Sequence, residues 1–103
     1  MTKIVLLCSS GMSTSILVQK MKKAADKINY EADISAHSIT EAKEVGALAD
    51  IVLLGPQVRF NLSSVQTEIP TVPVEVIDMH AYGTMDGLAV INMVKKVLEE
   101  KER

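Results

Sequence analysis

A cysteine followed by a run of hydroxyl residues is the part of this sequence best suited to chemistry. Cys8 ends an apolar stretch, and the residues after it combine one glycine with five hydroxyl side chains: Ser9, Ser10, Gly11, Met12, Ser13, Thr14 and Ser15. Backbone N–H groups at the start of a helix are unpaired, and the helix dipole adds partial positive charge beside them. A thiol at the mouth of such a turn has its thiolate stabilised. We therefore expect Cys8 to be a nucleophile whose phosphoryl group rests among the amides of residues 9–15.

The spacing within this loop separates several kinds of phosphate chemistry. No Gly-Lys-Thr or Gly-Lys-Ser follows, so binding of a nucleoside triphosphate is not predicted. The loop resembles that of low-molecular-weight tyrosine phosphatases and related arsenate reductases, in which an arginine occupies the place of Thr14. An arginine would clamp the phosphoryl oxygens and stabilise a hydrolytic transition state. Its absence favours a phosphoryl carrier. A cysteine phosphatase and a thiol-sensing or anion-binding module remain the alternatives.

Five further polar residues are candidates for smaller roles near this loop. Gln57 follows an apolar strand and would donate a side-chain hydrogen bond close to the loop, so we treat it as a possible auxiliary residue. Asp78 is expected to cap a strand-to-helix turn. His80 lies in the expected loop 78–83, on the same side of the sheet as Cys8, but no motif reaches it. His37 and Arg59 are interpreted as surface residues.

Alternating strand and helix patterns position these residues. The continuous apolar runs 3–8 and 50–55 indicate strands covered on both faces, whereas 32–37 and 72–78 mix apolar with polar residues and indicate edge strands. Helices are expected where apolar residues recur with helical spacing: over 16–28, from a capping box at Ser38 to Gly46, from Pro56 to Ile69, and after an Asp86 cap with Leu88, Ile91, Val94 and Leu98 facing inward. The basic residues of the helix 16–28 are interpreted as a solvated face.

This alternation predicts an α/β fold with three layers, in which a four-stranded parallel sheet of order 2-1-3-4 has helices on both faces. The order follows because the two buried strands belong in the centre of the sheet. The direction of winding then reverses between the first and third strands, and open α/β sheets bind ligands at the carboxyl ends of the strands that flank such a reversal. Cys8 ends the first of those strands.

Length and composition limit the remaining possibilities. The chain has 103 residues, which fits a single domain over 1–103, and a net charge of 11 − 13 = −2, which gives nucleic acids little to bind. Aromatic residues make up only 3%. One cysteine cannot form an internal disulfide, and we expect no metal and no cofactor. No stretch approaches the ~18 apolar residues of a membrane span, so we expect a cytoplasmic protein.

Four stretches together resemble one known family. They are 4–15, with the motif Cys-Ser-x-Gly-Met-Ser-Thr-Ser, then 49–57 ending in Gly-Pro-Gln, then 73–78, and the pair Tyr82-Gly83. This pattern resembles the enzyme IIB component of the lactose/cellobiose (diacetylchitobiose) class of the bacterial phosphoenolpyruvate-dependent sugar phosphotransferase system. The resemblance spans essentially the whole chain, and its loop motif is highly specific.

The resemblance implies a relay of phosphoryl groups. Cys8 would accept a phosphoryl group from a phosphohistidine of a IIA protein, and Ser9 to Ser15 would form the phosphate-binding loop. The phosphocysteine would then donate to a sugar held by a membrane IIC permease, expected to be a β-linked disaccharide such as cellobiose, chitobiose or lactose. A transient carrier of this kind has no need to oligomerise, so we expect a monomer.

Overall fold

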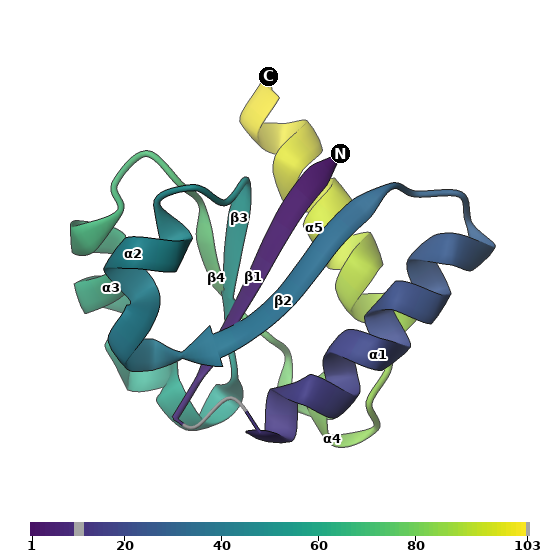
Figure 1. Ribbon diagram of the computed structural model, residues 1–103, viewed down its shortest axis with the longest axis horizontal. Coiled ribbons are helices and arrows are strands. Elements are labelled where there is room, and N and C mark those ends of the chain that lie inside the picture. Colours follow the sequence, from purple (N-terminus) through teal and green to yellow (C-terminus); the bar gives the residue numbers. More distant parts are fainter. Residues whose placement is uncertain (10–11, 103) are drawn as a thin grey trace.

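Strands and helices alternate along the chain in the computed structural model, which describes residues 1–9 and 12–102 (Figure 1). The strands are β1 (Thr2–Cys8), β2 (Ala32–Ser38), β3 (Ile51–Leu54) and β4 (Val74–Val76). The α-helices are α1 (Met12–Lys27), α2 (Ala42–Gly46), α3 (Leu62–Glu68), α4 (Met79–Gly83) and α5 (Gly87–Glu102). Two 3₁₀ segments, η1 (Ile39–Glu41) and η2 (Pro56–Asn61), precede α2 and α3.

The four strands form one sheet of order β2-β1-β3-β4, in which every neighbouring pair is parallel. This confirms the expected order 2-1-3-4. The two central strands are also the most apolar, and β3 is buried along its whole length. Leu7 of β1 lies in register with Leu54 of β3 and with His37 of β2, so the carboxyl ends of these three strands meet at one edge of the sheet.

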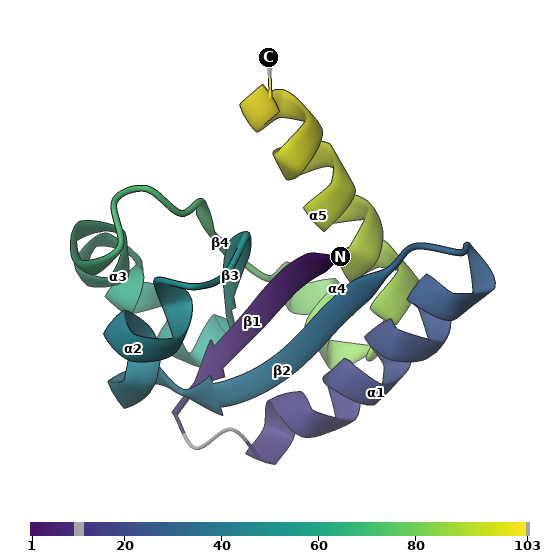
Figure 2. The same ribbon diagram turned by 45° about the horizontal axis from the view of Figure 1, so that its top comes forward.

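Alternate residues of the central strands contribute to two separate apolar cores. Ile4 and Leu6 face the first core, whereas Val5 and Leu7 face the second. Helices α1 and α5 supply the first core, and α2 and α3 supply the second. The two views show these helices on opposite sides of the sheet, so the expected three layers are confirmed (Figures 1 and 2).

The loop expected over 78–83 is instead mostly helical. Asp78 accepts a hydrogen bond from the Ala81 N–H at 3.0 Å and caps α4, so its expected capping role is confirmed. The strand expected over 72–78 is correspondingly shorter. Pro73 has no N–H to donate, although its carbonyl accepts from Val52 at 3.0 Å, and the Asp78 cap begins a helix soon after β4.

Two helix predictions also need correction. The segment expected to be one helix from Pro56 begins as η2, because the backbone of Val58 departs from helical values (φ −113°, ψ 20°) before α3 forms. Leu88, expected to face inward, is 45% exposed, since the buried side of α5 is centred on Val90, Ile91 and Val94. Within the described residues, no helix combines the length and the apolar character that crossing a membrane requires.

Candidate functional site

Cys8 lies where the winding of the sheet reverses. It is the last residue of β1, between the ends of β2 and β3, and its register partner on β2 is Ser38. The N–H of Gly55, the first residue after β3, donates to the carbonyl of Leu7 at 2.9 Å and extends the ladder to this edge. The thiol therefore lies at the carboxyl ends of the strands, where open α/β sheets place their ligands.

The start of α1 brings a hydroxyl group against the sulfur. The Sγ atom of Cys8 and the Oγ1 atom of Thr14 lie 3.3 Å apart, and either atom can be the donor. Both residues are buried, with exposed fractions of 1% for Cys8 and 0% for Thr14. When the sulfur is a thiolate it can only accept, so the Thr14 hydroxyl is then the donor and stabilises the charge.

The expected phosphate-binding loop is described at its two ends. Ser9 is exposed and follows β1, whereas Ser10 and Gly11 lie outside the described residues. Met12 and Ser13 begin α1, and Ser15 is exposed in its first turn. Because α1 begins four residues after Cys8, the backbone N–H groups of its first turn lie at the same edge of the sheet as the thiol.

Gly55 lies beside Cys8, a contact that the sequence analysis did not predict. A Cβ atom at position 55 would lie 3.6 Å from the Cβ atom of Cys8 and 3.6 Å from the carbonyl oxygen of Leu7. The signal was present in the sequence: aligning the two apolar runs in register places this glycine next to the cysteine. Both separations are those of ordinary van der Waals contact.

Gln57 lies beside the same glycine. Its Oε1 atom is 3.0 Å from the position that a Cβ of Gly55 would occupy, and that position is 3.6 Å from the Cβ of Cys8. The Oε1 atom is therefore within 3.0 + 3.6 = 6.6 Å of the Cys8 Cβ. Gln57 is exposed at the start of η2, so its amide is free to turn toward a group attached to the sulfur.

The other polar candidates have local partners. Arg59 donates to the carbonyl of Pro56 at 2.9 Å, and its guanidinium carbon lies 4.4 Å from the centre of the exposed Phe60 ring. His37 lies 3.1 Å from the Ser35 hydroxyl and 3.9 Å from the carboxylate of Glu41. His80 is exposed on α4.

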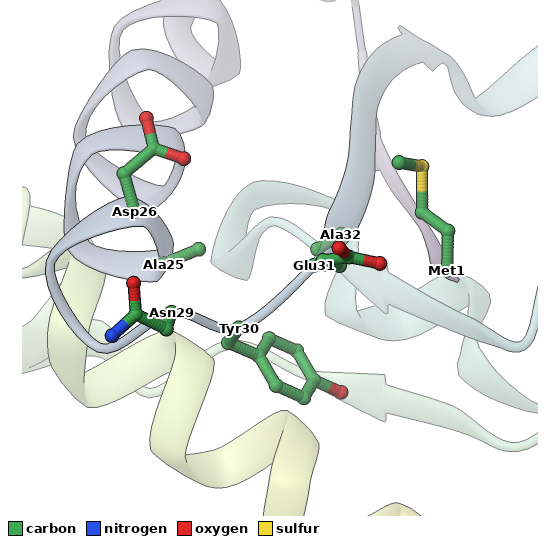
Figure 3. A pocket seen from close by; sticks show the side chains of 7 residues that line it. All are labelled: Met1, Ala25, Asp26, Asn29, Tyr30, Glu31 and Ala32. Carbon is green, nitrogen blue, oxygen red and sulfur yellow. The ribbon is translucent and has the colours of Figure 1, made fainter.

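A hollow of about 370 Å³ lies far from the thiol, at the amino-terminal edge of the sheet (Figure 3). It is formed where the end of α1 turns into β2, and Figure 3 shows the carboxylates of Asp26 and Glu31 among its side chains. Cys8 lies at the opposite end of β1. Across residues 1–9 and 12–102, no group of His, Cys, Asp and Glu side chains is arranged to hold a metal ion.

Comparison with known proteins identifies the family of this fold and site. Residues 3–93 match the family model described as the lactose/cellobiose-specific IIB subunit of the PTS, the sugar phosphotransferase system. The chain belongs to this family. The match includes Cys8 and the whole segment 9–15, and it confirms the resemblance inferred from the sequence.

Relatives of this IIB chain have matching lengths. An oligo-beta-mannoside-specific EIIB component of Bacillus subtilis (strain 168) is 54% identical over 89 residues, covering 84% of this chain and 86% of that protein. A galactose-specific EIIB component of Lactococcus lactis subsp. cremoris (strain MG1363) is 39% identical over 102 residues, covering 92% of this chain and 94% of that protein. IIB components belong to the sugar phosphotransferase system, so this chain is a component of that system.

Solved structures of IIB components share the fold. The cellobiose-specific IIB component from Borrelia burgdorferi superposes with a TM-score of 0.81 at 39% identity, covering 97% of this chain and 94% of that one. The lactose-specific IIB domain from Streptococcus pneumoniae superposes with a TM-score of 0.78 at 13% identity, covering 89% of this chain and 95% of that one. The second similarity shows that the fold persists where little of the sequence does.

Proposed function

We propose that this IIB chain carries a phosphoryl group on Cys8, between a IIA phosphohistidine and a sugar bound by a membrane IIC permease. The observation that carries the proposal is the buried pair of Cys8 Sγ and Thr14 Oγ1, 3.3 Å apart at the carboxyl edge of the sheet. A thiolate held by a hydroxyl beside the amino end of a helix is both a nucleophile and the start of an anion site.

Cys8 alone can accept the phosphoryl group from the histidine and pass it to the sugar. In the first, the Cys8 thiolate attacks phosphorus, the S–P bond forms, and the N–P bond breaks with its electrons left on the histidine ring. In the second, a sugar hydroxyl oxygen attacks phosphorus, the S–P bond breaks, and the thiolate is restored while the hydroxyl proton leaves to a base on the permease side. The amides at the start of α1 and the Thr14 hydroxyl stabilise the charge on the phosphoryl oxygens, so the protein's work is mainly positioning and electrostatics.

The residue at position 14 favours a carrier over a hydrolase. A hydrolase must bring water to the phosphorus and stabilise the resulting charge, yet the arginine position of the phosphatase loop holds the uncharged, buried Thr14. A phosphocysteine protected from water would survive until a partner protein opens the site.

Gln57 completes the proposed site. Its amide lies within 6.6 Å of the Cys8 Cβ, the sum of the 3.0 and 3.6 Å separations through the Gly55 position. We propose that the NH₂ group of this amide donates to an oxygen of a phosphoryl group on the sulfur. This contact would add to the amides of α1 from the other side of Cys8.

The sugar is proposed to be a β-linked disaccharide such as cellobiose, chitobiose or lactose. Relatives named for oligo-beta-mannoside and for cellobiose support this class. We further propose that the protein works in the cytoplasm as a monomeric domain spanning 1–103, meeting the IIA donor and the IIC permease in turn. The sugar itself would be held by the permease.

Intact-protein mass spectrometry tests the carrier directly. The protein is incubated with phosphoenolpyruvate, the general phosphotransferase proteins and a IIA protein of the same class. The wild type should gain one phosphoryl group, and Cys8→Ser should gain none while keeping its circular dichroism spectrum, since sulfur to oxygen is a small change in volume. Ser64→Ala, an exposed position on α3 outside the loop, is the matched control and should be phosphorylated. A phosphoryl group on Cys8→Ser, or none on the wild type, contradicts the proposal.

A further inference from the structure

A groove lies between the second half of α1 and the start of α5. It encloses about 330 Å³, and its walls combine lysine stems with apolar side chains: Lys20, Lys23, Lys27, Ile28, Met85 and Leu88. Ile28 is 38% exposed and Leu88 is 45% exposed. The sequence pattern predicted Leu88 to face the core, and its exposure here leaves an apolar surface uncovered.

The charge around the groove is unbalanced. Lys20, Lys23 and Lys27 make no ion pair with any residue of the described part of the chain. The carboxylate of Asp86 also lines the groove, but it accepts a hydrogen bond from the Ala89 N–H at 3.0 Å and caps α5. The chain as a whole carries a net charge of −2, so this rim is a local exception. The apolar walls and basic rim of the groove are therefore complementary to a partner surface on which carboxylates flank apolar side chains.

The groove is within reach of a protein that docks on Cys8. Lys20 is eight residues from Met12, the first residue of α1, which is a separation of about 12 Å at the ~1.5 Å rise per residue of a helix. A specific interface covers about 800 Å² on each partner, which is roughly 30 Å across. Lys27, at the far end of the groove, is about 22 Å from Met12 on the same scale, so an interface of this size is wide enough to include both the first turn of α1 and the groove.

We infer that this groove binds an acidic, amphipathic helix of the soluble phosphoryl-donor protein, an inference that rests on the proposed carrier function. Grooves between two helices accept the apolar face of a third, and carboxylates beside that face would meet the lysines. The permease fits less well, because cytoplasmic loops of membrane proteins carry excess Lys and Arg. A lipid bilayer fits less well because the groove is concave.

The test measures the initial rate of Cys8 phosphorylation against the concentration of phosphorylated IIA donor. The groove variant is Lys20→Gln/Lys23→Gln/Lys27→Gln. Its control, Lys22→Gln/Lys43→Gln/Lys96→Gln, removes the same charge from exposed lysines outside the groove. The groove variant should raise the KM for the donor about tenfold with kcat little changed, and the KM should depend less on salt. The control should keep the KM of the wild type within about twofold.

A second pair of variants tests the apolar wall without changing charge. Leu88→Ser should raise the donor KM, whereas Leu48→Ser, at a residue 74% exposed outside the groove, should not. Thermal unfolding confirms that each variant folds.

Equal KM values for the groove and control variants overturn the inference and leave the carrier function standing. Absence of transfer to the wild type overturns both. Sedimentation with vesicles of phosphatidylcholine and phosphatidylglycerol in equal parts tests a lipid surface. Vesicle binding that only the groove variant loses, at unchanged donor KM, would assign the groove to lipid and overturn the inference.

Discussion

The closest approach of α1 and α5 depends on the absence of a side chain at Gly87. A Cβ atom at this position would lie 2.4 Å from the carbonyl carbon and oxygen of Lys20 and 2.6 Å from the backbone nitrogen of Met21. Non-bonded carbon atoms normally stay about 3.5 Å apart, so Gly87→Ala forces the two helices about 1 Å further apart. The obstacles are backbone atoms, which cannot move aside as a flexible side chain would.

The magnitude follows from two opposing terms. Overpacking of a well-packed site costs about 1–3 kcal/mol, and contact with a helix backbone belongs at the upper end of that range. Alanine is favoured over glycine within a helix by up to about 1 kcal/mol. We therefore expect Gly87→Ala to lower the free energy of unfolding by about 2 kcal/mol. For a domain of this size, that corresponds to a fall in Tm of about 8–16 °C.

Urea unfolding followed by circular dichroism measures this difference, and two other glycines calibrate it. Gly83 has no atom within 4 Å of its would-be Cβ, so Gly83→Ala should leave the free energy of unfolding unchanged or slightly raised. Gly46→Ala should fall between the two, because the Cβ would meet the mobile end of the Ile69 side chain at 2.9 Å. If Gly87→Ala is as stable as Gly83→Ala, the reasoning about helix contact is refuted.

Two further predictions concern the thiol and its surroundings. Thr14→Val removes the hydroxyl that lies 3.3 Å from Sγ, and it should slow alkylation of Cys8 by iodoacetamide at neutral pH roughly tenfold. The reason is that a hydrogen bond to a charged group contributes about 1.5 kcal/mol. An unchanged alkylation rate would show that the hydroxyl does not stabilise the thiolate. Gln57→Ala should slow phosphoryl transfer to Cys8 about fivefold, which corresponds to the loss of about 1 kcal/mol of stabilisation. Gln66→Ala on α3 is the control and should not change the rate. Equal rates for the two variants would show that Gln57 is not part of the site.

The order of the sheet was predictable because burial leaves a different pattern on central and edge strands. The runs that include Ile4 to Cys8 and Ile51 to Leu54 are apolar without interruption, and both lie in the middle of the sheet. Capping residues were equally clear: Ser38 accepts from the Thr40 N–H, and Glu41 accepts from the Ser38 N–H, as the capping box predicted. Both patterns are visible within short stretches of the sequence, so they can be recognised without knowledge of the tertiary structure.

The predictions were wrong where contacts between distant parts of the chain determine the structure. Leu88 fits an apolar stripe in the sequence, but the approach of Gly87 to the backbone of Lys20 fixes how α5 is turned, and the side chain next to that contact is left at the surface. The short helix α4 has too few residues to show a helical period, and only the Asp78 cap indicated it. Cys8 and Thr14 were predicted to belong to one loop motif, but neither their contact nor their burial was predicted, because both depend on the packing of α1 against the sheet.

The division of the interior into two cores has a consequence for how this protein can change. Among the described residues, the buried side chains beneath α2 and α3 form one cluster and those beneath α1 and α5 form another, with the sheet between them. The sheet thus separates the packing of the core beneath α2 and α3 from the packing of the core beneath α1 and α5. The side carrying α2 and α3 is free to exchange one set of aliphatic residues for another of similar volume. Such drift leaves undisturbed the helix whose first turn adjoins Cys8.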